Sequence, residues 1–257
     1  LLMRIAHLWI EKFRNHNQAI RPLENVLALD PRQRDAIELL RQIYERRRDW
    51  RKLLDVLKKE VDIIDEPEQR RERLIELAEM AQKRLNLSHE SIQLWNKVLE
   101  FNHQDEQALA ALESLYEQER RWLALVEVCQ RRLEQIDDDK SKIAIYSKLG
   151  QIFGERLKIE QMAIESWSKV LQLDPEHTLA QRVLTDAYLR IQDWEHLEEI
   201  YGRTGKWRDF VGILGNYAER TPEHSVKIQL FFKMAEVCDK HLQDRHMAVR
   251  SYERILV

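Results

Sequence analysis

Apolar residues recur along the chain at the three- and four-residue steps that place side chains on one face of an α-helix. Between residues 67 and 138, four such stripes follow one another, separated by polar connections of two to five residues. The stripes are Leu74, Leu77, Ala78 and Ala81; Ile92, Trp95, Val98 and Leu99; Ala108, Leu112, Leu115 and Tyr116; and Trp122, Leu125, Val126 and Cys129. Because the connections are short, consecutive helices must pack antiparallel. The segment therefore predicts two helical hairpins of about 36 residues each.

This pattern repeats every 72 residues. The matching positions are Ile20, Ile92 and Ile164; Val26, Val98 and Val170; Ala36, Ala108 and Ala180; Leu40, Leu112 and Leu184; Tyr44, Tyr116 and Tyr188; and Trp50, Trp122 and Trp194. Chance does not align so many small, aliphatic and aromatic residues in three copies. The chain is therefore built from a repeated structural element that shares its core with its neighbours.

The period breaks after Trp194. The later matches are Gly150 with Ala235, Ile164 with Val249 and Val170 with Ile255, each 85 residues apart. Since Trp207 precedes Ala235 by the same 28 residues that separate Trp122 from Gly150, the 13 extra residues fall within 195–207. Gly202 and Gly205 in this insertion predict a helix end followed by a turn. We expect the insertion to add a helical piece and to bend the stack.

Composition adds limits to this picture. Lys plus Arg number 42 and Asp plus Glu 45, so the formal net charge of -3 gives no global argument for nucleic acid or a membrane surface. Cys129 and Cys238 lie far apart and outside any CxxC, which fits a reducing compartment, and we expect a cytoplasmic location. No apolar run is long enough to insert into a membrane. The start at Leu1 reads like a helix entered midway, so we expect a segment of a longer chain.

The segment from Ile143 to Pro175 resembles a tetratricopeptide repeat. The residues that carry the resemblance are Leu149, Gly150 and Phe153 in the first helix, and Ala163, Trp167, Val170 and the ending Leu173-Asp174-Pro175 in the second. Leu29-Asp30-Pro31 repeats that ending, whereas Phe101-Asn102-His103 lacks the proline. The alternating, tryptophan-marked hairpins are similar to those of long bacterial arrays of this family. A weaker resemblance, through Trp95 and Trp167, is to the half-tetratricopeptide repeats of RNA-processing scaffolds.

The resemblance covers essentially the whole chain and implies an all-α fold. It implies a right-handed α-solenoid of stacked antiparallel hairpins, with about 14–15 helices. We expect one solenoid over residues 1–257, with double-hairpin repeats at approximately 1–66, 67–138 and 139–222 and a partial one at 223–257. In this family the first helices of the hairpins line a concave groove that binds a peptide or a partner helix.

Reactive residues do not converge in the sequence. It contains no P-loop, GxGxxG, GxSxG or HExxH motif, and His241 and His246 are not spaced to share one helix face as metal ligands. The register places Cys129 and Cys238 at core positions, and the repetition of Trp50 and its equivalents indicates packing residues. We therefore expect neither catalysis, nor a cofactor, nor a metal site.

The predicted groove is acidic and polar in its first half and mixed further along. Its candidate partner-binding residues are Asp35, Glu38, Gln42, Glu45, Glu72, Glu79, Gln82 and Glu117, followed by Arg182, Asp186 and Arg190, with Phe232 beyond them. No first helix carries the Lys and Asn pair with which some family members bind a C-terminal carboxylate. The hypothesis is a basic or mixed protein segment, attracted weakly and in a salt-dependent way. That these positions are merely solvated remains an open alternative.

RNA and a second copy of the chain are the alternatives to a segment of a partner protein. Basic runs such as Arg46-Arg47-Arg48 and Arg131-Arg132 would neutralise phosphates in an RNA-associated assembly scaffold, but acidic residues interrupt them. Self-association is a further expectation, since apolar residues at both termini need cover from adjoining repeats or another copy. Those terminal residues are Leu1, Leu2 and Ile5, and Ile255, Leu256 and Val257.

Overall fold

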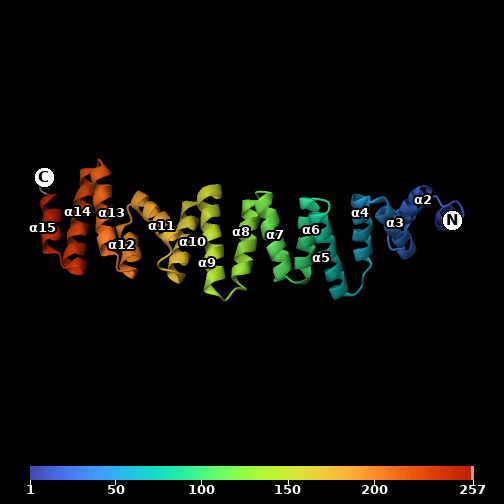
Figure 1. Cartoon of the computed structure of the whole chain (residues 1–257), viewed down its shortest axis with the longest axis horizontal. Coiled ribbons are helices and arrows are strands. Elements are labelled where there is room, and N and C mark those ends of the chain that lie inside the picture. Colours follow the sequence, from blue (N-terminus) through green and yellow to red (C-terminus); the bar gives the residue numbers. More distant parts are fainter. Residues whose placement is uncertain (256–257) are drawn as a thin grey trace. The chain divides into compact units, whose positions relative to one another are not determined.

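The computed structural model describes residues 1–255 and is helical throughout (Figure 1). Fifteen α-helices and two π-helical segments form in this part of the chain, and no strand is present in it. The predicted all-α helical-repeat fold is therefore confirmed. The residues divide into two compact units, unit 1 from Leu1 to Gln135 and unit 2 from Ile136 to Val257. A single right-handed solenoid over the whole chain stays a prediction.

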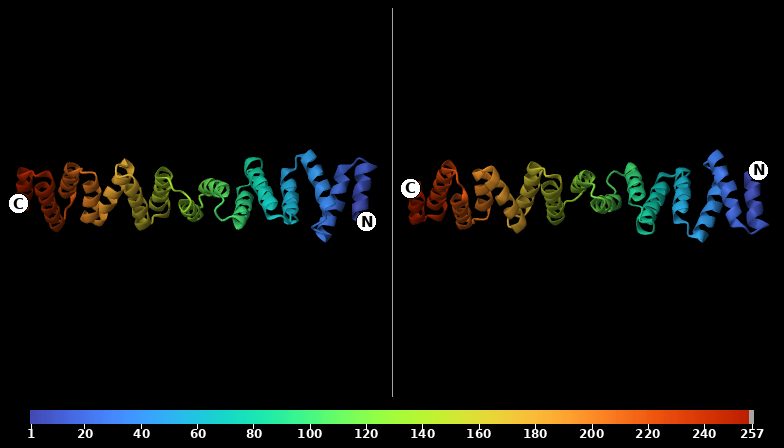
Figure 2. Two further views of the ribbon diagram at one scale, coloured as in Figure 1. Left: turned by 90° about the horizontal axis from the view of Figure 1, so that it is seen from below. Right: turned by 90° about the horizontal axis from the view of Figure 1, so that it is seen from above.

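Unit 1 consists of four helical hairpins. Its helices are α1 (Leu2–Glu11), α2 (His16–Leu29), α3 (Arg34–Arg47), α4 (Trp50–Asp62), α5 (Pro67–Lys83), α6 (Ser88–Phe101), α7 (Glu106–Gln118) and α8 (Trp122–Leu133). Each odd-numbered helix packs closely against the next even-numbered one, and α2, α4 and α6 also contact the helix that follows them (Figure 2). The repeat predicted between residues 67 and 138 therefore contains the four expected helices.

Unit 2 continues the same alternation with two additions. Its elements are α9 (Asp139–Gln151), η1 (Ile152–Leu157), α10 (Glu160–Leu173), α11 (Thr178–Ile191), α12 (Trp194–Arg203), α13 (Trp207–Arg220), α14 (His224–Val237), η2 (Cys238–Leu242) and α15 (Arg245–Glu253). The 13-residue insertion contributes the break between α12 and α13. Gly205 adopts φ +66° there, a left-handed conformation that glycine reaches without strain. The predicted helix end and turn are thus present.

The repeated apolar positions form the core. In all three copies, the isoleucine, valine, alanine, leucine and tyrosine spaced by 72 residues are at most 9% exposed. Ala36, Ala108 and Ala180 are completely buried, as expected where helix backbones approach closely. Cys129 and Cys238 are also completely buried, and burial raises the pKa of the Cys238 thiol. Both cysteines therefore occupy the core positions that the repeat register predicted, and neither is exposed as a reactive cysteine would be.

The turns inside the hairpins also recur with the repeat. The turn before each repeated tryptophan contains one residue in the left-handed region, namely Arg48, Arg120, Gln192 and Gly205. A second series occurs where the first helix of the other hairpin ends, at Arg14, Asn86, Lys158 and Gln243. Left-handed backbone costs roughly 1 kcal/mol for a residue with a Cβ atom. Its recurrence at the same points of each copy shows that these turns belong to the repeated hairpin.

Two residues that the repeat aligns, Ile164 and Val249, differ in burial. Val249 aligns with Ile164 by the 85-residue interval, yet Val249 is 54% exposed and Ile164 is 9% exposed. In the described residues α15 packs mainly against α14 and η2, whereas α10 also packs against α11. At the other terminus Leu1 is 96% exposed. Ile255 is half-buried, and Leu256 and Val257 lie outside the described residues.

Candidate partner-binding surface

The structure places the predicted groove residues on four helices in two units. Asp35, Glu38, Gln42 and Glu45 lie on α3, Glu72, Glu79 and Gln82 on α5, and Glu117 on α7, all in unit 1; Arg182, Asp186 and Arg190 lie on α11 in unit 2. All of them are exposed or half-buried. The acidic set and the mixed set therefore belong to different units, and only the acidic set can be built into one site.

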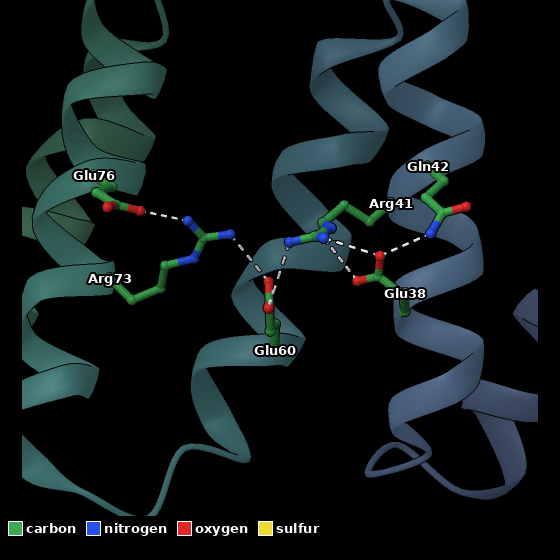
Figure 3. Close-up of polar contacts among 6 residues, drawn as sticks. All are labelled: Glu38, Arg41, Gln42, Glu60, Arg73 and Glu76. Carbon is green, nitrogen blue, oxygen red and sulfur yellow. Dashed lines mark hydrogen bonds and ion pairs between the residues drawn. The ribbon is translucent and has the colours of Figure 1, made fainter.

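Helices α3, α4 and α5 are joined by a chain of polar contacts (Figure 3). Gln42 donates to Glu38 at 2.8 Å, and Arg41 pairs with Glu38 at 2.8 Å. Glu60 on α4 lies between two guanidinium groups, 4.0 Å from Arg41 and 3.2 Å from Arg73. Arg73 in turn pairs with Glu76 on α5. These six residues are called the polar ladder below.

The polar ladder neutralises part of the predicted acidic surface. The hydrogen bond from Gln42 holds the pKa of the Glu38 carboxyl below its usual range, and the Arg41 guanidinium adds to this against the opposing effect of burial. Burial alone would lower the pKa of Arg73, but hydrogen bonds to Glu76 and Glu60 outweigh it and raise that pKa. Glu38 is thus charged at neutral pH, and its charge is already engaged within unit 1.

Two hollows open on α3, α4 and α5, and ladder residues line both of them. The first, of about 620 Å³, is called the Trp50 hollow and is lined by Glu45, Trp50, Leu53, Leu57, Arg73, Glu76, Leu77, Glu79, Met80, Lys83 and Arg84. The second, of about 480 Å³, is lined by Arg34, Ile37, Glu38, Glu60, Ile63, Ile64, Asp65, Glu66 and Gln69. Each combines apolar side chains with charged ones.

The Trp50 hollow brings together two predicted groove residues, Glu45 from α3 and Glu79 from α5. Glu79 pairs with Lys83 at 2.8 Å and accepts a hydrogen bond from Gln107 at 3.1 Å. Among the described residues, no hydrogen bond or ion pair engages the Glu45 carboxylate. The Arg84 guanidinium lies 5.7 Å from the centre of the Trp50 ring. The hollow thus offers an apolar floor beneath a rim with a carboxylate that has no partner.

Glu60 and Arg73, the centre of the polar ladder, were not among the residues predicted from the sequence. A signal for them does exist in the repeat. Arg41 and Glu60 align at 72 residues with Glu113 and Arg132, which also form an ion pair, with the charges exchanged. Two repeat positions whose charges are exchanged between copies indicate a contact between them, and this signal could have located the pair of Arg41 with Glu60.

The polar ladder leads to a stability prediction. We expect the substitution Glu60→Gln to lower the free energy of unfolding of unit 1 by about 1–2 kcal/mol, because two partly buried guanidinium groups lose a shared partner. Urea denaturation measures this. The matched control copies the second repeat: Glu38→Ala, Arg41→Glu, Glu60→Arg and Arg73→Ile together reproduce Ala110, Glu113, Arg132 and Ile145. Recovery of the lost stability in this quadruple variant is expected, and a quadruple variant no more stable than Glu60→Gln would contradict the pairing.

The described residues contain no group of three or more His, Cys, Asp or Glu side chains that could hold a metal ion. Within residues 1–255 no helix is long and apolar enough to cross a bilayer. The site on α3, α4 and α5 is a hollowed surface of stacked hairpins, lined partly by apolar and partly by charged side chains. Such a combination defines the class of helical-repeat proteins that serve as scaffolds for protein interactions.

Comparison with known proteins identifies the family within this class. The family model of the tetratricopeptide repeat matches residues 36–72 and 108–144, two segments in the same phase of the 72-residue repeat. The chain thus contains tetratricopeptide repeats in these two segments, and the fold of this family is in general a non-catalytic scaffold for protein interactions. A search of curated proteins finds no match.

Solved structures of other repeat proteins are similar to the chain. MamA has 17% identity and a TM-score of 0.37, over 65% of this chain and 91% of its own. The C-terminal part of a repeat protein from Cytophaga hutchinsonii has 15% identity and a TM-score of 0.38, over 98% and 93%. A tetratricopeptide repeat protein from Parabacteroides merdae has 12% identity and a TM-score of 0.35, over 98% and 97%. These values are too low to support any inference about partners.

Proposed function

We propose that unit 1 binds a basic or mixed segment of a partner protein, as a peptide or a helix, at the Trp50 hollow. The observation that carries the proposal is the combination within one hollow of an apolar floor and the Glu45 carboxylate, which has no partner of its own. A bound segment would place apolar side chains on Leu53, Leu57 and Met80 and a cation beside Glu45. Glu72 and Glu79 on α5 add negative charge that attracts such a segment.

The remaining predicted groove residues have weaker support as contacts. Glu38 and Gln42 are engaged in the polar ladder, and Arg190 pairs with Glu160 at 3.0 Å. Asp35, Gln82, Glu117, Arg182 and Asp186 remain part of the proposal as outer positions of the groove. The comparisons do not favour the RNA-associated scaffold, which a salt-titrated RNA pull-down would still detect. A cytoplasmic setting remains part of the proposal, because Cys129 and Cys238 are both buried and lie far apart in the sequence.

The test uses the 257-residue chain and a display library of random peptides. We expect selection of peptides that combine Lys or Arg with large apolar residues. The triple substitution of Glu45, Glu72 and Glu79 by Lys is expected to weaken binding of a selected peptide by about tenfold or more, because attraction at the rim becomes repulsion. Raising the salt concentration is expected to weaken binding to the unchanged protein as well. Fluorescence anisotropy measures both effects.

The matched control places the same charge changes elsewhere in unit 1. Glu100, Glu119 and Glu127 are exposed and lie outside the Trp50 hollow. Their replacement by Lys changes the net charge equally, so general electrostatics predicts an equal loss of binding. The proposal predicts little loss. Equal losses in the two triple variants, or selected peptides that carry no basic residue, would exclude the Trp50 hollow as the binding site for a basic segment.

A further inference from the structure

The second hollow on α3, α4 and α5, of about 480 Å³, is called the Ile63 hollow below. Its apolar residues are Ile37, which is 3% exposed, and Ile63 and Ile64, which are half-buried. Charged side chains line the rest of it, with four carboxylates against one guanidinium: Glu38, Glu60, Asp65 and Glu66 against Arg34. The Ile63 hollow therefore combines an apolar floor with a lining of net negative charge.

Two of the four carboxylates in the Ile63 hollow are not neutralised by a cation. Glu38 and Glu60 are engaged with Arg41 in the polar ladder. Among the described residues, by contrast, no hydrogen bond or ion pair engages the Asp65 carboxylate. The Glu66 carboxylate accepts a hydrogen bond at 2.5 Å from the side chain of Gln69, which is neutral. The negative charge that remains for a partner thus lies on the connection between α4 and α5, where both residues are exposed.

The end of α4 adds to the attraction of the Ile63 hollow for a cation. Helix α4 ends at Asp62, and Ile63 and Ile64, which line the hollow, follow directly. The carbonyl groups at a helix C-terminus carry a partial negative charge, which favours a cation near the last turn. A long basic side chain fits this combination, because its methylene stem can cover the isoleucines while its charged end reaches the carboxylates. The Ile63 hollow is therefore suited to a Lys or Arg side chain of a partner.

The polar ladder lies between the Ile63 hollow and the Trp50 hollow (Figure 3). Its residues Glu38 and Glu60 line the Ile63 hollow, whereas Arg73 and Glu76 line the Trp50 hollow. On α3, Glu45 of the Trp50 hollow is seven residues from Glu38 and eleven from Arg34 of the Ile63 hollow. At the rise of an α-helix, the two hollows are therefore about 10–16 Å apart along α3, or two to three turns.

The ladder also bears on the conformation of a segment that crosses it. Its charged groups pair with one another, so they leave little for the backbone of an extended peptide to bond. A helix satisfies its own backbone groups. A helix also returns to the same face after seven and eleven residues, which matches the separation of the hollows. Both points favour a helix over an extended peptide.

We propose that the partner segment is an amphipathic helix that lies along α3 across both hollows. An apolar residue of this helix occupies the Trp50 hollow, and a Lys or Arg seven or eleven positions away occupies the Ile63 hollow. This second anchor rests on the proposed function, because the Trp50 hollow holds the other end of the same segment. It adds the conformation of the partner, a second binding position and the spacing between the two.

The probe is a pair of synthetic peptides of the same length and composition, each held helical by a covalent bridge. In the in-phase peptide, two arginines follow a leucine by seven and eleven positions, on the same helix face. In the out-of-phase peptide they follow it by five and nine positions, on the opposite face. Both are also made with the reversed sequence, because a helix can lie along α3 in either direction. Fluorescence anisotropy against the 257-residue chain should show that the in-phase peptide binds about five- to tenfold more tightly in one of the two directions.

The decisive comparison uses two double variants of the protein. Asp65→Asn with Glu66→Gln removes the two carboxylates without a cationic partner, and it should abolish the preference for the in-phase peptide. Both residues are exposed, so the unfolding midpoint should stay the same. Glu100→Gln with Glu119→Gln removes the same charge at exposed positions outside both hollows, and this control should keep the preference.

Three results would overturn the second anchor: no saturable binding of either peptide, equal affinity of the two peptides, or a preference that survives the substitutions at Asp65 and Glu66. The triple Lys variant of Glu45, Glu72 and Glu79 is measured with the same peptides. If it weakens binding while the two peptides bind equally, the proposed function stands and only the second anchor fails. If neither it nor the variant at Asp65 and Glu66 changes binding, both fail. Where no peptide binds, the display selection decides the proposed function by itself.

Discussion

The substitution Trp95→Ala is expected to lower the free energy of unfolding of unit 1 by about 3–5 kcal/mol, the cost of truncating a fully buried aromatic residue. Trp95 is 1% exposed in the middle of α6 and is among the largest fully buried side chains of the chain. Its loss leaves a cavity where α5 and α6 pack together, and the rigid helices cannot close it. Urea denaturation followed by circular dichroism measures the change.

Two controls separate cavity formation from other effects of this substitution. The Nε1 group of Trp95 is buried and has no hydrogen-bond partner among the described residues, so Trp95→Phe removes an unsatisfied donor while it keeps most of the apolar contact. We expect that variant to lose only about 1 kcal/mol. Trp50→Ala, at a half-buried residue that begins α4, is expected to cost far less than Trp95→Ala. A loss at Trp95 no larger than that at Trp50 would contradict the assignment of Trp95 to the core.

The substitution Gly150→Ala is the second change with a large expected effect on stability. The direction of the change tells whether helix propensity or packing dominates at this position. In a helix interior alanine is favoured over glycine by about 1 kcal/mol, so propensity alone predicts stabilisation. A Cβ atom at position 150, however, would lie 2.6 Å from the Cε2 and Nε1 atoms of Trp167. Trp167 is 2% exposed and has little freedom to move. We therefore expect unit 2 to lose about 1–3 kcal/mol of stability through overpacking.

A second glycine of unit 2 provides the matched control. Gly212 lies in α13, and a Cβ atom added there meets nothing within 4 Å. Gly212→Ala should therefore show the propensity effect by itself and stabilise the protein by about 0.5–1 kcal/mol. Opposite signs at the two glycines, read from shifts of the unfolding midpoint, are the expected result. Stabilisation by both substitutions would show that Trp167 can move away at little cost.

Gly150 also illustrates how much the sequence could predict. Its alignment with Ala78 and Ala235 identified a position that requires a small residue. The alignment did not reveal which neighbour imposes the requirement, because Trp167 reaches Gly150 through the packing of α10 on α9. Likewise, the repeated tryptophans were assigned to packing, but their burial differs. Trp95 and Trp167 are fully buried, whereas Trp50 and Trp122 are half-buried at helix starts.

The candidate site was predicted only in outline. Glu45 and Glu79 were selected as groove residues, and the structure brings them to the same hollow. Glu38 was selected for the same reason, yet Arg41 and Gln42 engage its carboxylate. A helical pattern shows which residues face outward, but the partner of each outward charge depends on which helix packs beside it. Pairs such as Glu60 with Arg73, on α4 and α5, follow from that packing alone.

The sequence by itself determined the helices, the 72-residue repeat, its break at residues 195–207 and the buried stripes. These features are periodic or local, and burial of one apolar face per helix enforces them in every copy. Only the tertiary structure decided which charges neutralise one another and where hollows open between the helices. Those properties depend on contacts between residues that are distant in the sequence, because neighbouring helices bring them together. The Trp50 hollow arises at this level.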